Sequence, residues 1–374
     1  MPRMHIVATT INFPRFLQTY RENLQKFGHI DDVKMWVVGD RKTPVESAAF
    51  AQEQKKQGLD VVYLDPESQQ NWLRRFPDLD AIIPWNTDNR RNVGFLRALE
   101  EDCQVLVSID DDNYPLPHSD FYAGHIETGS RVERLVMGSD NGWFNICSEL
   151  IIEPKVDVVP RGYLYRKRNP TVVSRGTKSV TLAAHAGLWL GDPDVDAATR
   201  LAFPVRAVGT TKRNIALEPG VWSPINTQNT SVARRAIPAY YYVRMLEPLP
   251  GAKLDRYGDI WSGYFITRCA EHLGEAIGVG QPEVDHQRNV HDLLADLRAE
   301  FWGMILTPLF IDALRAGKLE GSDYASAARS LASLLEQSAA DIEAKAAVPG
   351  VADYISRIGS HLRLWVDICD ELGD

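Results

Sequence analysis

The chain has 374 residues, of which 44% are hydrophobic and 24% are charged, so it can bury one large core or two modest ones. Its net charge of −9 argues against a general nucleic-acid binder, because phosphate backbones are bound through clustered positive charge.

Cysteine usage and apolar runs bear on where the protein works. The four cysteines show no CxxC spacing, so neither a zinc site nor a disulfide framework is indicated. The first residues, MPRMHIVATT, lack the apolar core of a signal peptide, and no apolar run approaches the length of a membrane span. We therefore expect a soluble, cytoplasmic protein with no membrane span and no nucleic-acid partner.

Short β-branched runs alternate with helical patterns through the first 115 residues. The strand-like runs are MHIVATTI at the start, VKMWVVGD over 33–40 and DVVYLD over 60–65. A helical pattern follows each of the first two runs, over about 14–27 and 45–57, and another covers about 89–101. Strands alternating with helices of this length predict βαβ units and a parallel sheet, so we predict an α/β protein with a Rossmann-type nucleotide-binding half.

Three consecutive carboxylates, Asp110, Asp111 and Asp112, follow the apolar run from Val105 through Ile109. Ligands of open α/β sheets bind beyond the carboxyl ends of the strands. Clustered oxygen ligands suit hard divalent cations such as Mg²⁺ or Mn²⁺. A solvated turn is the alternative, because Asp, Asn and Pro are also usual where a strand ends.

Phosphate binding, if present, needs a metal and basic side chains, because no GxGxxG or GxxxxGK[ST] motif follows these strands. Arg90 and Arg91 precede the acidic strand, and the densest basic cluster is Arg161, Arg166, Lys167 and Arg168. Planar guanidinium groups suit a pyrophosphate. A solvated helix face or loop is the alternative for both groups.

Helical periodicity returns from Tyr257 and predicts four helices in the last third of the chain. They are YGDIWSGYFITRCAEHLG, a helix from about 290 to beyond 301, and two helices over 324–345 and 351–372. The apolar stripe expected to be buried on the second of these is Val290, Leu293, Leu294, Leu297 and Phe301. We expect core packing as the main role of these helices and a homo-oligomeric contact as the second. We divide the chain into a catalytic domain, 1–310, and a helical extension, 311–374.

Several separated tracts together resemble the reversibly glycosylated polypeptide family, which includes UDP-arabinopyranose mutases and self-glycosylating proteins of GT-A glycosyltransferase fold. The tracts are IVATTI, RNVGF, SIDDDNY, PRGYLYRKR, HAGLWLGDPDVDAATRL and RYGDIWSGY, in that order over about 300 residues. The resemblance implies a GT-A-like fold, with a mixed central sheet, that binds a nucleotide sugar.

The resemblance also implies that the acidic triplet holds Mn²⁺ or Mg²⁺ and, through it, the diphosphate of the nucleotide sugar. It places Asp110 on the nucleoside side and as a metal ligand, Asp112 on the metal, and Asp111 in support. His286 lies where this fold often supplies a late histidine ligand. A histidine with only structural hydrogen bonds is the alternative for His286.

Asp259 lies where the family has two adjacent acids, and here the first is replaced by Gly258. We expect Asp259 to carry the catalytic step, with an N-cap as the alternative, and Trp261 and Tyr264 to offer apolar faces to a sugar ring. Arg161 matches the family arginine associated with reversible glycosylation. An arginine is a poor nucleophile, so we expect a phosphate clamp instead.

The remaining candidate residues belong to two groups. Asp194 and Asp196 are the next candidates for the catalytic acid. The residues that we further expect to contact the nucleotide sugar are Arg91, Arg168, Thr9, Asp40 and His185.

We therefore expect a metal-dependent glycosyltransferase that uses a nucleotide-sugar donor, in particular a UDP-sugar, and a small-molecule or self acceptor. A UDP-sugar pyranose/furanose mutase is the alternative, and the surroundings of Arg168 depart from the plant-type pattern. A non-catalytic nucleotide-sugar-binding subunit is the second alternative, and the Gly258 departure favours it.

Overall fold

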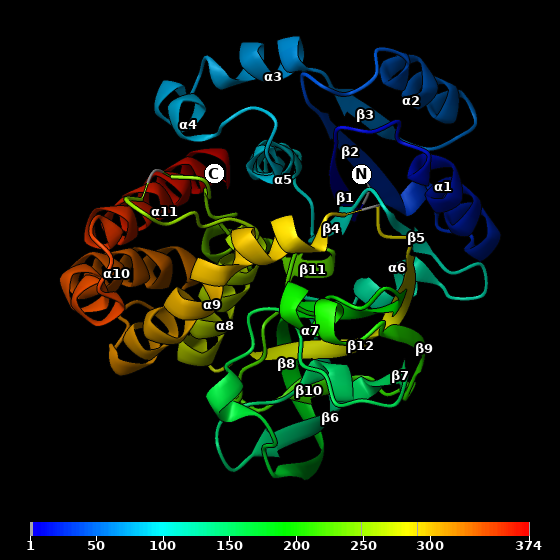
Figure 1. Cartoon of the computed structure of the whole chain (residues 1–374). Helices are drawn as coiled ribbons and strands as arrows, with labels where there is room; N and C mark the ends of the chain where they lie inside the picture. Colours follow the sequence, from blue (N-terminus) through cyan, green and yellow to red (C-terminus); the bar gives the residue numbers. More distant parts are fainter. Residues whose placement is uncertain (1–2, 248, 290, 374) are drawn as a thin grey trace.

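The computed structural model describes residues 3–247, 249–289 and 291–373. Four parallel strands form the first half in the order β3-β2-β1-β4, and helices connect them (Figure 1). The strands are β1 (Met4–Thr10), β2 (Val33–Gly39), β3 (Val61–Leu64) and β4 (Val105–Asp110). The helices are α1 (Phe16–Phe27), α2 (Glu46–Lys56), α3 (Pro66–Leu73), α4 (Pro77–Ile82) and α5 (Arg91–Glu100). The predicted Rossmann-type half is confirmed, with α3 and α4 as two short helices that the sequence analysis did not identify.

The second half continues the same sheet with mainly antiparallel strands. Its elements are β5 (Asn113–Pro115), α6 (Phe121–His125), β6 (Arg131–Ser139), β7 (Leu150–Glu153), β8 (Val172–Gly191), α7 (Ala197–Ala202), β9 (Arg206–Thr210), β10 (Ile215–Leu217), β11 (Asn229–Ala233) and β12 (Ala276–His286). Strand β11 joins the halves by pairing antiparallel with both β4 and β8. Strands β8, β6, β10 and β12 then pair in a closed circuit, so the predicted mixed central sheet is confirmed.

Four long helices pack beside the sheet (Figure 1). They are α8 (Gly258–Leu273), α9 (Leu293–Ala316), α10 (Tyr324–Ala346) and α11 (Val351–Gly373). The apolar face of α11 is buried in one core with α5, α8 and α10, which confirms the expected core packing. A subunit contact and a domain boundary at residue 310 stay predictions, and α9 runs through that position. In the described part of the chain, no helix combines the length and the apolar character needed to cross a membrane.

The apolar stripe expected at the start of α9 is wrong. Leu294 is 68% exposed and Phe301 is 49% exposed, and Val290 lies outside the described residues. The buried face of the first turns instead carries Asp296 and Glu300, whose carboxylates pair with arginines of the neighbouring site. Apolar periodicity could not reveal this face, because its buried side chains include carboxylates that form ion pairs with arginines.

A layer of buried polar side chains lies inside the sheet where β8, β11 and β12 meet. His125 bonds through Nδ1 to Ser231 Oγ and through Nε2 to Asn229 Oδ1, both at 2.9 Å. His185, in the middle of β8, bonds through Nε2 to the Gln281 carbonyl at 2.6 Å. Burial lowers the pKa of His125 to about 3 and that of His185 to about 4.

These two histidines make stability depend on pH in a defined direction. The unfolded chain binds protons at both imidazoles near pH 6.5, whereas the folded chain does not bind them until about pH 4 and below. The free energy of unfolding should therefore fall as the pH is lowered from 6.5 to 4, by up to about 1.4 kcal/mol per pH unit for each histidine. His185→Gln should show a smaller slope in chemical denaturation, whatever its absolute stability.

The exposed His118→Gln serves as the control and should keep the slope of the parent. Equal slopes for the parent and His185→Gln between pH 6.5 and 4 would contradict the assignment.

Candidate functional site

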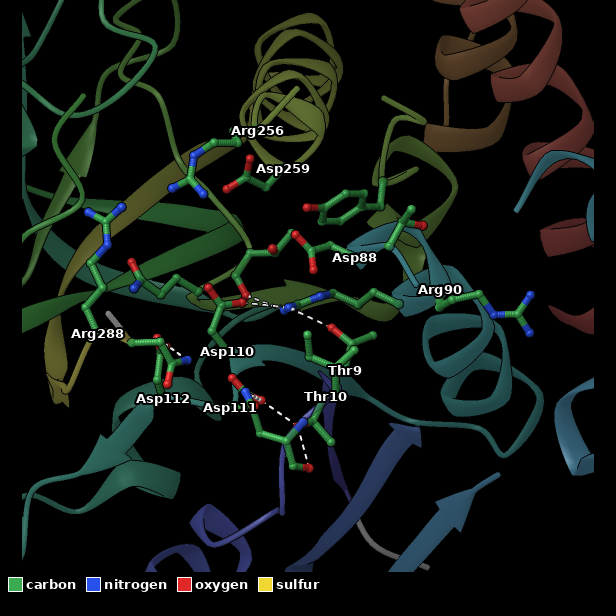
Figure 2. Close-up of a pocket in the computed structure, with 18 of the residues that line it drawn as sticks. Thr9, Thr10, Asp88, Arg90, Asp110, Asp111, Asp112, Arg256, Asp259 and Arg288 are labelled. Carbon is green, nitrogen blue, oxygen red and sulfur yellow. Dashed lines mark hydrogen bonds and ion pairs between the residues drawn. The ribbon is translucent and has the colours of Figure 1, made fainter. Parts of the chain in front are cut away.

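A cavity of about 310 Å³ opens where the carboxyl ends of the parallel strands meet the start of α8 (Figure 2). Thr9 and Thr10 end β1, Asp40 follows β2, and Asp110 ends β4. Asp259 comes from α8, and His286 and Arg288 come from the end of β12 and the loop after it. Segments that are far apart in the sequence therefore meet at the sheet edge where α/β proteins bind ligands.

Arg91 is buried and holds the end of β4 in place. Its guanidinium donates to Ser108 Oγ at 2.7 Å, to the carbonyls of Ile109 and Thr227, and to Thr9 Oγ1. It also donates to Asp110 Oδ1 at 2.6 Å. Burial alone would lower the pKa of Arg91, but the Asp110 carboxylate outweighs burial and raises it above its ordinary value. Arg91 thus lines the cavity as the partner of Asp110, and no contact with a diphosphate is needed to explain its burial.

Asp111 ties the acidic turn to the end of β1. Its Oδ2 accepts hydrogen bonds from Thr10 Oγ1 and, at 3.1 Å, from Asn12 Nδ2. Burial raises the pKa of both Asp111 and its neighbour Asp110. The supporting role expected for Asp111 agrees with these contacts.

Asp112 and His286 face each other because β5 pairs with β12. The register sets Asn113 opposite His286, so the residue before Asn113 lies beside the imidazole. His286 Nε2 is 3.6 Å from Asp112 Oδ2, while its Nδ1 bonds to the backbone carbonyl of Asp192. That second bond fixes the ring with Nε2 directed at Asp112, as in histidines that ligate metals. His286 offsets the effect of burial and keeps the pKa of Asp112 below its usual range.

Among the described residues, no three His, Cys, Asp or Glu side chains lie close enough together to hold a metal by themselves. Asp112 and His286 still fit a Mg²⁺ or Mn²⁺ ion, because such ions are often bound by one or two side chains together with substrate phosphates and water. The Asp110 carboxylate, expected as a further ligand, is paired with Arg91 instead.

Arg161 lies between two carboxylates and uses all five of its N–H groups. Nε and one terminal nitrogen donate to the two oxygens of Asp194 at 3.0 and 3.1 Å. The terminal nitrogens also donate to Asp259 at 2.8 and 3.2 Å and to the Arg256 carbonyl. Burial is outweighed by Asp194 and Asp259, which raise the pKa of Arg161 far above its ordinary value. Arg161 therefore has no N–H group left in this structure to donate to a phosphate, as the expected phosphate clamp would require.

Asp259 lines the cavity and does not cap α8. The N-cap position is Tyr257, and no side chain caps this end of the helix. The prediction that Trp261 and Tyr264 offer apolar faces to a sugar ring is wrong, because both side chains are fully buried. Trp261 stacks on Phe310 with ring centroids 4.4 Å apart. The periodicity of α8 places both rings on its core side.

The other expected residues divide into those that line the cavity and those that do not. Thr9, Asp40 and Asp194 line it. Asp196 does not, because its carboxylate caps α7 by accepting from Thr199 N at 2.8 Å, so its expected catalytic role is wrong. His185 is equally misplaced as a nucleotide contact, since it belongs to the polar layer inside the sheet.

Arg168 is exposed outside the cavity, with its guanidinium carbon 4.4 Å from the centre of the Tyr165 ring. The solvated loop, the alternative for this basic cluster, describes Arg168 better than a nucleotide contact does. Arg90 lines the cavity but points away from its centre in Figure 2 and donates to Gln69 and Ile83.

The sequence analysis missed several residues that line the cavity: Asp88, Arg200, Tyr242, Arg256 and Arg288. Two of them lie inside tracts already singled out, and a third lies close to a candidate residue. Arg256 begins the RYGDIWSGY tract, Arg200 is near the end of the HAGLWLGDPDVDAATRL tract, and Arg288 lies two residues after His286. Tyr242 and Asp88 carried no such signal, and removal from bulk water raises the pKa of Asp88 to about 6.

Comparisons with known proteins agree with these motifs. The model of the family described as reversibly glycosylated polypeptide matches residues 71–373. UDP-arabinopyranose mutase 1 of Arabidopsis thaliana is 26% identical over 199 residues, which are 52% of each chain. A probable UDP-arabinopyranose mutase 1 of Pisum sativum is 27% identical over 218 residues, which are 57% of this chain and 54% of that protein. The chain thus spans about half the length of the curated relatives it matches.

Among solved structures, glucosyl-3-phosphoglycerate synthase from Mycobacterium tuberculosis, in complex with Mn²⁺ and UDP-glucose, is 12% identical with a TM-score of 0.36. The match covers 82% of this chain and 78% of that one. S. aureus TarS is 11% identical with a TM-score of 0.38, over 90% of this chain and 43% of that one. Because the family model covers most of the sequence, the chain belongs to the reversibly glycosylated polypeptide family.

Proposed function

We propose that the protein binds a UDP-sugar together with a divalent cation and transfers the sugar to an acceptor. The observation that carries this proposal is the pairing of Asp112 with an oriented His286 at the carboxyl end of β4. The names of the curated relatives, UDP-arabinopyranose mutases, support UDP as the nucleotide. A small-molecule or self acceptor and a cytoplasmic location are parts of the proposal that rest on the sequence.

The metal part of the proposal assigns Asp112 and His286 as the side chains that hold Mn²⁺ or Mg²⁺. Such an ion, when bound, would neutralise the charge that develops on a departing diphosphate. Asp110 is assigned to the nucleoside side, because the hydrogen bond from Arg91 fixes its carboxylate in position at the end of β4. Thr9 and Asp40 complete that side of the cavity.

The catalytic part of the proposal assigns Asp259 to the sugar. The guanidinium of Arg161 contacts both of its oxygens, which restricts the movement of the carboxylate. An ionised acid can orient an acceptor hydroxyl or stabilise positive charge at the anomeric carbon. Arg161 is then a positioning residue that holds Asp194 on one side and Asp259 on the other.

A sugar-ring mutase is the second candidate function, and the curated relatives favour it. The site differs from the two adjacent acids expected for the family at Gly258. A Cβ atom at Gly258 would lie 2.4 Å from the Val243 carbonyl oxygen and 2.7 Å from the Tyr242 ring. A side chain at position 258 would meet these groups, so the site has Asp259 alone where the family motif has two acids.

One experiment separates transfer, isomerisation and binding without turnover. The protein is incubated with Mn²⁺ and a panel of UDP- and GDP-sugars, and the products are identified by mass spectrometry and NMR. Transfer or hydrolysis supports the proposal, and a ring-isomerised nucleotide sugar supports the mutase. Binding without either product would support the non-catalytic subunit.

Removal of the Asp112 carboxylate should abolish the metal dependence of nucleotide binding. In Asp112→Ala, the affinity for UDP in Mn²⁺, measured by calorimetry, should fall to that of the parent protein in a chelator. Asp285→Ala is the control, because Asp285 precedes His286 but does not line the cavity. Unchanged Mn²⁺-dependent affinity in Asp112→Ala would reject the metal assignment.

Asp259→Asn keeps the shape of the side chain and removes its charge. We expect donor binding within a few-fold of the parent and turnover at least about a hundredfold lower, the scale of losing a catalytic acid or base. Asp196→Asn retains a capping oxygen outside the cavity and should leave turnover nearly unchanged. Comparable turnover in the two variants would mean that Asp259 is not the catalytic acid.

The Arg161 contacts predict a large structural role. Arg161→Gln leaves two buried carboxylates without their shared cation, so the free energy of unfolding should fall by about 3–5 kcal/mol. The nearby Arg166 pairs with Asp312 at the surface, and Arg166→Gln should change stability by at most about 1 kcal/mol. Chemical denaturation measures both, and equal losses would show that the buried contacts do not stabilise the fold.

A further inference from the structure

Two arginines that line the cavity, Arg256 and Arg288, differ from Arg161 in how they use their N–H groups. Among the described residues, the Arg256 guanidinium forms one hydrogen bond, to Glu300 at 3.0 Å. The Arg288 guanidinium also forms one, to Asp296 at 2.7 Å. Figure 2 shows both side chains on the same side of the cavity. Each therefore keeps N–H groups that a ligand can use.

Two of the three carboxylates that pair with these arginines lie behind them, and the third, Asp192, is 3.8 Å from Arg288 and lines the adjoining groove. Asp296, on the buried face of α9, is 2.7 Å from Arg288 and 3.4 Å from Arg256, so it bridges the two. Glu300, one turn further along, pairs with Arg256 and also accepts from the Ala197 backbone N–H. Neither carboxylate lines the cavity, whereas both arginines do. The acids thus fix the arginines from the rear and leave their other edges directed at the cavity.

A groove of about 760 Å³ adjoins the cavity on this side. Five residues line both spaces: Arg200, His286, Arg288, Asn289 and His291. The far side of the groove is formed by Phe203, Pro204, Val205 and Arg206, from the end of α7 to the start of β9. A ligand that extends from the cavity into the groove therefore passes this shared set of residues, which includes Arg200 and Arg288.

Positive charge is crowded at this junction. Burial and the nearby Arg288 lower the pKa of Arg200 to about 9. The Arg200 guanidinium also donates to the Pro193 and Val195 carbonyls and pairs with Asp192. Like charges held together in a partly dry site are stabilised when an anion binds between them.

We propose that Arg256 and Arg288, with Arg200 beside them, form an anion subsite that binds a phosphate or carboxylate group at the junction of the cavity and the groove. The anion has two possible sources, the diphosphate of the donor or an acidic group on the acceptor. The subsite deepens the proposed function, because its ligand occupies the same cavity. Anion binding at these arginines can nevertheless be measured without a nucleotide.

The test uses Arg256→Gln and Arg288→Gln, with Arg329→Gln as the matched control. Arg329 pairs with Asp367 and Asp370 on the C-terminal helices, away from the cavity. Arg288 lies in the loop between β12 and α9, so Arg288→Gln tests the subsite if Arg256→Gln fails to fold. Thermal unfolding confirms that each variant is folded before its binding is measured.

Binding of inorganic pyrophosphate in the absence of metal is measured first, by calorimetry. We expect at least a tenfold loss of affinity in each cavity variant and no change in Arg329→Gln. Equal pyrophosphate affinity in the parent and both cavity variants would overturn the proposal. If pyrophosphate binding depends on these arginines but UDP does not bind in Mn²⁺, the subsite stands and the proposed function fails.

Two further comparisons identify the source of the anion. A loss of affinity for UDP but not for uridine assigns the subsite to the donor diphosphate. A loss of affinity for glycerol 3-phosphate, with UDP and Mn²⁺ present and with glycerol as the uncharged reference, assigns it to the acceptor. If UDP binds in Mn²⁺ and neither comparison shows a loss, a role in ligand recognition is contradicted and the proposal is overturned.

Discussion

The contact of Arg161 with two carboxylates holds the candidate site together. Asp194 comes from the loop after β8, Asp259 from the first turn of α8, and Arg161 from the loop that precedes β8. Two of these three segments are loops, so the backbone alone does not fix the relative positions of the three side chains. A planar cation with five N–H groups can contact two acids in defined directions, which a lysine cannot do. The position of Asp259 at the cavity therefore depends on a residue that has no direct contact left for a ligand.

The arginines of the cavity serve different purposes, although their charge is the same. Arg91 and Arg161 are buried, and their hydrogen bonds fix the protein's own carboxylates in place. Arg256 and Arg288 each donate one guanidinium hydrogen bond among the described residues, and both line the cavity. An acidic protein with a net charge of −9 can still present local positive charge to an anionic ligand in this way. The total charge of the chain says little about the sign of the field inside one cavity.

Sequence periodicity and strand-end chemistry predicted much of the architecture and part of the site. The alternation of strands and helices identified the Rossmann-type half, and the apolar run ending at Asp110 identified the edge where the cavity lies. The pairing of Asp112 with His286 rested on the family resemblance, because the β5–β12 register joins residues about 170 positions apart.

Other features had no readable signal in the sequence. Apolar periodicity failed at α9 because the buried face there carries Asp296 and Glu300, which are buried by ion pairs. The densest basic cluster was misleading, since charge density does not show whether Arg168 points into a cavity or into water. The sequence likewise could not show that His185 completes a polar layer inside the sheet, because the residue type alone does not distinguish a buried structural histidine from one that binds a ligand.

The packing at Gly258 bears on how this site can change in evolution. The Tyr242 ring and the Val243 carbonyl occupy the space that a side chain at position 258 would need. Tyr242 is itself held by hydrogen bonds between its backbone and the side chains of Asn89 and Asn92. A second acid therefore cannot be introduced at position 258 by one substitution without a clash. Because one of the blocking groups is a backbone carbonyl, the main chain at residue 243 must also move, and a smaller side chain at position 242 does not suffice.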